Sequence, residues 1–176
     1  MANSKILIAY FSRRGNNYFN GRITNLSIGN TEIVAQKIQK LTGSDLFEIK
    51  TVKQYPEDYY KTTEMAKEEK RKNARPELAN KLENISSYEM IFLRYPNWWG
   101  TMPMAVFTFL ESYDFTGKTI APFCTHEGSG LGSSEHDIKK LCPNANVLPG
   151  LAIRGSNVNQ ADKDIQNWLS KLGLST

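Results

Sequence analysis

The sequence is poor in the residues that bind metals and form disulfides. Its only cysteines are Cys124 and Cys142, and its only histidines are His126 and His136. They form no CxxC pair and no zinc-ligand spacing, so no metal centre is expected. A disulfide is possible in principle but is disfavoured in a reducing cytosol, and both cysteines are expected to be buried apolar residues. A redox role for Cys124 stays open, because a glycine-rich loop follows it.

Long apolar runs are also missing. No stretch approaches the ~20 residues that a membrane-spanning helix needs. Residues 1–5 run straight into a strand-like segment and leave no room for a signal peptide. We therefore expect a cytoplasmic protein without membrane insertion. The 176 residues contain no linker-like segment, so residues 1–176 are expected to form a single domain.

The excess of positive charge is small. The chain has 22 Lys and Arg against 18 Asp and Glu, a formal net charge of +4. This is mild for a nucleic-acid-binding protein, and no helix-turn-helix pattern is present. The densest charge run, residues 67–72, mixes both signs and is typical of a solvated helical face. Nucleic acid is therefore not an expected partner.

What the sequence does contain is a regular alternation of strand and helix patterns. It predicts strands at residues 5–12, 46–52, 90–95, 118–125 and 147–153, and helices at residues 29–43, 55–73, 103–110, 133–142 and 161–172. This alternation predicts an α/β fold with a doubly wound five-stranded parallel sheet, most often in the order 2-1-3-4-5. Pro122 should sit where the sheet needs no N–H donor. Residues 13–28 are too irregular to assign.

In that strand order the loops after strands one, three and four meet at the carboxyl edge of the sheet, where such folds bind ligands. The three loops are residues 12–31, 95–100 and 125–132, and they are the least ordinary stretches of the sequence. One unusual loop is a weak signal, but three that converge are a stronger one. We therefore expect the functional site there.

The first loop ends at the start of a helix, at Gly29, Asn30 and Thr31. Unpaired N–H groups and the helix dipole favour a phosphate at such a position. Gly29 lets the backbone approach a ligand closely, and Ser12 adds a hydroxyl. An ordinary helix cap explains the same residues. Neither GxGxxG nor GxxxxGK[ST] is present, so nothing favours a dinucleotide fold or an NTPase.

The other two loops offer aromatic faces and small residues. Trp98 and Trp99 either plug a gap at the sheet edge or lie against a flat aromatic ligand. Residues 125–132 form a glycine-rich loop or simply a tight turn. His126 is conceivable as a catalytic acid, although a lone loop histidine is more often solvated or structural. A phosphate at one end and a planar ring with hydrogen-bonding edges at the other suit flavin mononucleotide (FMN).

Together the three loops resemble those of the flavodoxin family. Residues 6–12 followed by residues 29–35 look like the first strand, phosphate loop and first helix of that family. Residues 95–103 are similar to the loop that covers one ring face in its tryptophan-rich bacterial branch, and residues 123–130 resemble the loop along the pyrimidine edge. The resemblance spans nearly the whole chain. It implies a flavodoxin-like fold with FMN as the cofactor.

The resemblance also implies roles for individual residues. Phosphate would be held by Ser12, Asn30 and Thr31, with Gly29 allowing close approach and Arg13 or Arg14 as helpers. Trp98 or Trp99, preceded by Pro96, would flank the isoalloxazine, while Asn97 and Gly100 would present backbone near its N5 atom. The ring edge would be lined by Thr125, His126, Glu127, Gly128, Ser129 and Gly130. No side chain is expected to act as acid, base or nucleophile.

Two features depart from the family. Its phosphate loop is usually compact, whereas residues 13–28 interrupt it here. Long loops at the mouth of a site are usually functional or disordered, so we expect this one to loop outward and to offer Asn17, Tyr18 or Arg22 to a ligand. The second departure is charge, since familiar electron-carrying flavodoxins are acidic.

The first functional hypothesis is an electron-transfer protein in which FMN performs the redox chemistry. Its partners would be redox proteins or small electron acceptors, and it would be a monomer or a homodimer. The second is an FMN-dependent NAD(P)H:quinone or azo-type reductase, with Arg13, Arg14, Arg22 and Arg154 near the nucleotide phosphates. The third is a non-catalytic module that binds another phosphate-bearing ligand or a protein.

Overall fold

The computed structural model describes residues 5–174, so residues 1–4 and 175–176 of the expected single domain, and most of the segment considered for a signal peptide, lie outside the described residues. The β-strands are β1 (Lys5–Tyr10), β2 (Gly15–Phe19), β3 (Arg22–Leu26), β4 (Asp45–Glu48), β5 (Tyr88–Pro96), β6 (Thr119–His126), β7 (Asn146–Val147) and β8 (Leu151–Arg154). The α-helices are α1 (Asn30–Thr42), α2 (Tyr59–Arg71), α3 (Met104–Ser112), α4 (Ser134–Leu141) and α5 (Asp162–Lys171). Two 3-10 helices, η1 (Ile85–Ser87) and η2 (Gly155–Gln160), complete the described elements.

The central sheet is parallel and has the order β4-β1-β5-β6-β7, with β8 also pairing with β6. This is the predicted 2-1-3-4-5 arrangement, and the flavodoxin-like fold class is confirmed. The fifth strand is split in two, because residues 148–150 leave the sheet between β7 and β8. The gap lies opposite Pro122, which pairs with Leu93 on its other side. Pro122, which has no backbone N–H, therefore lies where no neighbouring outer strand needs a hydrogen-bond donor.

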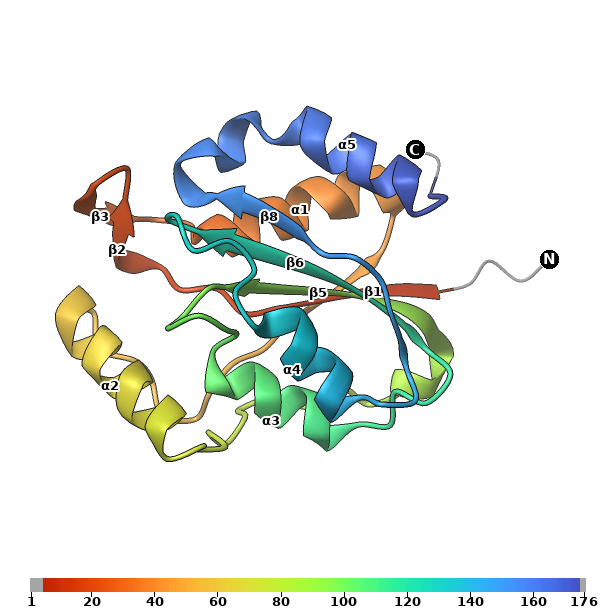
Figure 1. Cartoon of the computed structure of the whole chain (residues 1–176), viewed down its shortest axis with the longest axis horizontal. Helices are drawn as coiled ribbons and strands as arrows, with labels where there is room; N and C mark the ends of the chain where they lie inside the picture. The colour runs from red at the N-terminus through yellow and green to blue at the C-terminus, as the bar shows by residue number, and fades with distance from the viewer. Residues whose placement is uncertain (1–4, 175–176) are drawn as a thin grey trace.

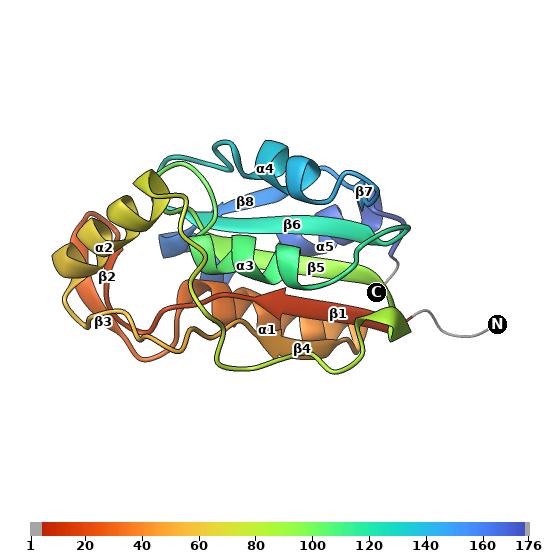
Figure 2. The same cartoon turned by 90° about the horizontal axis from the view of Figure 1, so that it is seen from below.

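Helices cover both faces of the sheet (Figures 1 and 2). On one face Leu7, Leu93 and Tyr95 pack with α3 and α4, and on the other Ile8 and Phe92 pack with α1 and α5. Successive strand residues therefore alternate between two separate cores, as the period of an extended chain requires. This double burial explains why the central strands read as continuous apolar runs.

Arg94 is an exception inside the second core. Its side chain is completely buried, and the guanidinium carbon lies 4.7 Å from the ring centroids of Phe92 and Phe123 and 4.9 Å from that of Trp168. Among the described residues, none of its side-chain nitrogens has a hydrogen-bond partner. Burial lowers the pKa of Arg94 well below its ordinary value. Three aromatic faces supply the cation–π attraction that partly offsets this burial.

Two segments differ from their predicted form. Residues 13–28, which we expected to loop outward, contain an antiparallel hairpin of β2 and β3 that lies near α2 at the carboxyl edge of the sheet (Figure 1). Its two-residue turn has φ of 50° at Asn20 and 80° at Gly21, as a type I′ turn requires. Helix α2 begins at Tyr59 rather than directly after Pro56, because the Asp58 side chain caps it by accepting a 2.8 Å hydrogen bond from the Lys61 N–H.

Both cysteines are buried and free. Burial raises the pKa of Cys124 to about 12 and that of Cys142 to about 11, so neither is a reactive thiolate near neutral pH. Within residues 5–174 there is no group of three or more His, Cys, Asp or Glu side chains that could hold a metal ion. No helix in the same part of the chain is long and apolar enough to cross a membrane.

Candidate functional site

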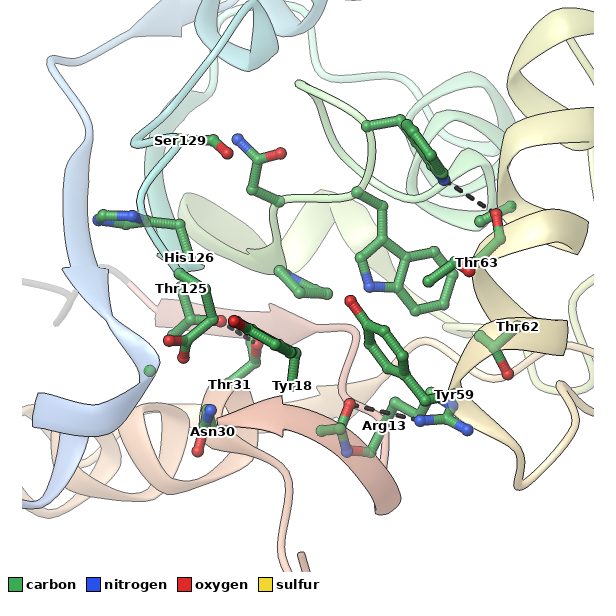
Figure 3. Close-up of a pocket in the computed structure, with 18 of the residues that line it drawn as sticks. Arg13, Tyr18, Asn30, Thr31, Tyr59, Thr62, Thr63, Thr125, His126 and Ser129 are labelled. Atoms are coloured by element: carbon green, nitrogen blue, oxygen red, sulfur yellow. Dashed lines mark hydrogen bonds between the residues drawn. The ribbon is translucent and has the colours of Figure 1, made fainter. Parts of the chain in front are cut away.

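The three predicted loops meet at the carboxyl edge of the sheet around one cavity of about 600 Å³. Of the site residues expected from the sequence, thirteen line it: Ser12, Arg13, Asn30, Thr31, Pro96, Asn97, Trp98, Trp99, Gly100, Thr125, His126, Glu127 and Ser129. Arg14, Gly29, Gly128 and Gly130 do not line it, although each belongs to one of the three loops. Figure 3 shows how the labelled side chains surround this space.

The first loop closes around the N-terminus of α1 in spite of the inserted hairpin. The Ser12 hydroxyl oxygen accepts a 3.3 Å hydrogen bond from the Glu32 N–H, so it serves as a helix cap from a distant part of the chain. A side chain at Gly29 would collide with Ser12 and the Arg13 carbonyl, which explains a glycine there. Thr31 donates or accepts a buried 2.9 Å hydrogen bond with the Thr125 hydroxyl, which ties the first loop to the third.

The two arginines of the first loop have different partners. Arg14 lies outside the cavity, where its guanidinium pairs with the Glu32 carboxylate at 2.7 Å. Arg13 lines the cavity and donates to the carbonyls of Pro56 at 2.6 Å, Glu57 at 2.7 Å and Asn16. Burial lowers the pKa of Arg13 from its ordinary value. Arg13 therefore links the start of the hairpin to the segment that leads into α2.

The tryptophan pair sits on a tight turn between Trp98 and Thr101. Trp99 has φ of 56° and Gly100 has φ of 85°, so both central residues are left-handed. Such a conformation is natural for glycine but strained for a bulky residue. Trp99 is held in it by α2, because its ring N–H donates to the Thr63 carbonyl at 2.9 Å and Lys70 donates to the Trp99 carbonyl.

The two indoles have distinct surroundings. Trp98 is half-buried and packs edge-to-face against Phe11 at 5.2 Å and Tyr55 at 5.1 Å between ring centroids. Trp99 leaves 46% of its surface exposed, with the Lys67 ammonium 5.5 Å from the centre of its ring. Both line the cavity, but only Trp98 is also anchored in the core.

The second and third loops are joined through Asn97. Its side-chain amide donates to the Gly130 carbonyl at 2.8 Å and accepts from the Gly100 N–H at 2.9 Å. The Gly100 carbonyl accepts from the Ser133 N–H at 2.8 Å, and a side chain at Gly132 would collide with that carbonyl. Both backbone groups of Gly100 are thus already paired in this structure.

His126 and Glu127 form the third side of the cavity. His126 Nδ1 accepts a 2.9 Å hydrogen bond from the Gly128 N–H, and burial, aided by Arg154, lowers the pKa of the imidazole. The Glu127 Oε1 atom is buried without a hydrogen-bond partner among the described residues. Burial raises the pKa of this carboxyl group, with Arg154 acting in the opposite direction. An unpaired buried acceptor in a cavity wall is the kind of atom that a ligand donor completes.

Sequence similarity and structural similarity give the same assignment. The profile of the family described as flavodoxin matches residues 5–172. A candidate flavoprotein from Bacteroides eggerthii is 31% identical, with 97% of this chain and 99% of that chain covered and a TM-score of 0.78. The chain belongs to the flavodoxin family.

Two further solved structures share the flavodoxin fold. A flavoprotein from Lactobacillus acidophilus in complex with FMN is 24% identical, with 90% of this chain and 98% of that chain covered and a TM-score of 0.66. Oxidised flavodoxin 2 from Bacillus cereus is 20% identical, with coverage of 96% and 99% and a TM-score of 0.51. No curated protein matches the chain.

Part of the cavity comes from elements that sequence reasoning did not place there. In addition to the hairpin residues Asn17 and Tyr18, which we had considered, it is lined by Leu26, Tyr59, Tyr60, Thr62, Thr63, Glu64, Ala66 and Gly155. Most of these belong to α2, which has no ligand-binding motif of its own. Arg22, also considered as a ligand contact, does not line the cavity. The feature of the sequence that could have indicated this part of the cavity is the adjacent pair Tyr59 and Tyr60 at the start of α2.

Proposed function

We propose that this chain binds FMN in the cavity at the carboxyl edge of the sheet and acts in cytoplasmic electron transfer. The observation that carries the proposal is the convergence of three loops on one space, with a helix N-terminus at one end and an indole at the other. When bound, FMN supplies the redox chemistry by accepting electrons and passing them on. The protein would bind and orient it and keep water away.

The end of the cavity at α1 fits a phosphate group. The helix starts at Asn30 after an N-cap Gly29 that has no side-chain cap, and Ser12 satisfies only the Glu32 N–H. The N–H groups of Asn30 and Thr31 lie in the first turn of the helix, where they have no intrahelical acceptor. Together with the positive end of the helix dipole they suit a dianion.

The opposite end of the cavity fits a planar ring. Trp98 offers an indole held in place by Phe11 and Tyr55, so little rotational freedom would be lost when a ring stacks on it. These features support FMN more than a ligand with phosphate alone.

Spectroscopy and a binding titration test the proposal. The purified protein should be yellow, or should quench the fluorescence of added FMN with one-to-one stoichiometry. After anaerobic photoreduction, the FMN-loaded protein should pass electrons to an added redox protein such as cytochrome c. A colourless protein that leaves FMN fluorescence unchanged would contradict the proposal. It would favour the hypothesis of a non-catalytic module that binds another ligand.

The NAD(P)H-dependent reductase has less support from the described contacts. Both terminal nitrogens of Arg13 donate to backbone carbonyls, Arg14 pairs with Glu32, and Arg154 contacts the Glu127 carbonyl at 3.5 Å. A nicotinamide-nucleotide diphosphate would need free cations at the mouth of the cavity. Turnover of menadione with NADH or NADPH, without an added reductase, would favour the enzyme over the carrier.

A further inference from the structure

The outer part of the cavity is built by three tyrosines from two elements. Tyr18 comes from the inserted hairpin, and Tyr59 and Tyr60 come from the first turn of α2. The ring centroids of Tyr18 and Tyr59 are 6.1 Å apart with planes 32° apart, and those of Tyr59 and Tyr60 are 5.5 Å apart at 75°. All three line the cavity, and Figure 3 shows the rings of Tyr18 and Tyr59 projecting into it. We call these residues the tyrosine rim.

The tyrosine rim is exposed but held in place. Tyr18 and Tyr60 leave 42% and 66% of their surfaces accessible, so neither ring contributes fully to a core. Arg13 donates to Asn16 in the hairpin and to Pro56 and Glu57 before α2, which ties the two elements of the rim together. Exposed aromatic rings on a braced cavity wall are typical of a surface that binds flat apolar molecules.

We propose that the tyrosine rim is a binding subsite for a planar, uncharged, quinone-type electron acceptor next to the FMN. This inference rests on the proposed function, because the quinone would be reduced by the bound cofactor. It assigns a role to the tyrosines of the hairpin insertion and of α2, which the phosphate-binding and ring-binding parts of the cavity leave without one.

The charges around the rim favour an uncharged ligand. Arg13, the only arginine in the cavity lining, donates from both terminal nitrogens of its guanidinium to carbonyl oxygens. Beside the rim, α2 also contributes the carboxyl group of Glu64 to the lining, and a carboxylate repels an anion. A neutral ring meets no such penalty. The Tyr59 hydroxyl can donate a hydrogen bond to a quinone oxygen, and burial raises the pKa of Tyr59, so it stays protonated at neutral pH.

The transfer to the quinone balances between the quinone and the reduced cofactor. The quinone gains two electrons and two protons and becomes the hydroquinone. Both electrons and both protons come from the two-electron-reduced cofactor, which returns to its oxidised form. An upstream redox protein supplies the cofactor with the next pair of electrons, and solvent supplies the protons. In the experiment below, photoreduction takes the place of that protein.

The test follows the oxidative half-reaction alone. FMN-loaded protein is photoreduced without oxygen and mixed rapidly with increasing menadione, and the return of the oxidised flavin spectrum is recorded. We expect a rate that saturates with menadione. Tyr18→Ala and Tyr60→Ala should each raise the half-saturating concentration about 10-fold, the effect of losing one stacking partner, while FMN affinity and the limiting rate stay close to wild type.

Conservative and distant variants separate stacking from general damage. Tyr18→Phe keeps the ring and should behave like wild type. Tyr88→Ala removes a tyrosine at the start of β5, outside the cavity lining, and should leave the half-saturating concentration unchanged. A second readout without turnover is the change in the oxidised flavin spectrum on adding menadione, which should weaken in Tyr18→Ala and Tyr60→Ala.

The possible outcomes distinguish this inference from the proposed function. A yellow wild-type protein whose reoxidation rises linearly with menadione, with equal slopes in the tyrosine variants, would overturn the subsite and leave FMN binding intact. Loss of FMN in Tyr18→Ala and Tyr60→Ala would also overturn it, because the rim would then belong to the cofactor site. A wild-type protein that binds no FMN would instead remove the proposed function, and the subsite with it.

Discussion

The inner wall of the cavity and its outer rim are built in different ways. The inner wall consists of the three loops after β1, β5 and β6, which are joined by buried or close contacts such as Thr31–Thr125 and Asn97–Gly130. The outer rim is the tyrosine rim, formed by exposed Tyr18 and Tyr60 and half-buried Tyr59 on a hairpin and a helix that Arg13 ties together. The strand order of the fold brings the loops of the inner wall together, whereas the outer rim is added to that fold by the hairpin and α2. Changes to the inner wall should therefore affect cofactor binding and folding. Changes to the rim should affect the binding of the electron acceptor.

The largest effect is expected where two inner loops touch. Gly132→Ala places a methyl group against the Gly100 carbonyl and adds the strain of a left-handed backbone. We expect a loss of about 3 kcal/mol in the free energy of unfolding and weaker FMN binding. Chemical denaturation and FMN titration measure both.

Gly117→Ala is the matched control. Gly117 has φ of 74° but nothing within 4 Å of an added methyl group. It should lose only the strain contribution, about 1 kcal/mol. Equal losses in the two variants would show that the contact between the loops contributes nothing.

The second prediction compares the two indoles. Trp98→Ala removes a ring anchored on Phe11 and Tyr55, and it should weaken FMN binding by about 1–3 kcal/mol. Trp99→Ala should weaken it less, because that indole is half exposed and is bound to α2 rather than anchored in the core. FMN titrations of both variants decide the order, and a larger loss in Trp99→Ala would reverse the assignment.

The third prediction concerns the outer rim. Arg13→Lys keeps the charge but cannot reach the carbonyls of Asn16, Pro56 and Glu57 at once. We expect a loss of about 1 kcal/mol in the free energy of unfolding and faster amide hydrogen exchange in β2 and β3. Exchange in β1 and β5 should stay unchanged. If protection in β2 and β3 were the same as in wild type, Arg13 would not be the link between hairpin and helix.

The smallest effect is expected at Glu127. Burial raises its pKa in the folded protein, so its contribution to stability is fully present below the unfolded-state pKa and is lost as pH rises through the folded-state value. Glu127→Gln removes this contribution. In the FMN-free protein, the stability of the variant relative to wild type should therefore increase between pH 4 and pH 7. Denaturant unfolding at the two pH values tests this, and parallel profiles would contradict it.

The sequence predicted the inner wall well because its signals are local. Apolar runs marked the central strands, and the rule for strand order then brought Ser12, Asn97 and Thr125 to one place without any knowledge of contacts. Pro122 was also interpretable, since a residue without an N–H constrains the strand beside it. The roles of the individual site residues toward FMN stay predictions.

The outer rim could not be predicted to the same extent. The hairpin was missed although Asn20-Gly21 is a strong turn signal, because the flanking residues are mostly polar and do not alternate as a half-buried strand does. Tyr59 and Tyr60 were missed for another reason. A helical pattern shows that α2 exists but not that it lies against the ends of strands far away in the sequence.

The buried guanidinium of Arg94 has a consequence for any measurement of the electrostatics of this cavity. Arg94 lies two positions before the cavity-lining Pro96 and has no contact with water. Dissolved ions screen surface cations such as Lys67 but hardly affect a charge sealed among aromatic rings. A titration with salt will therefore report mainly on the exposed charges around the cavity and hardly on Arg94.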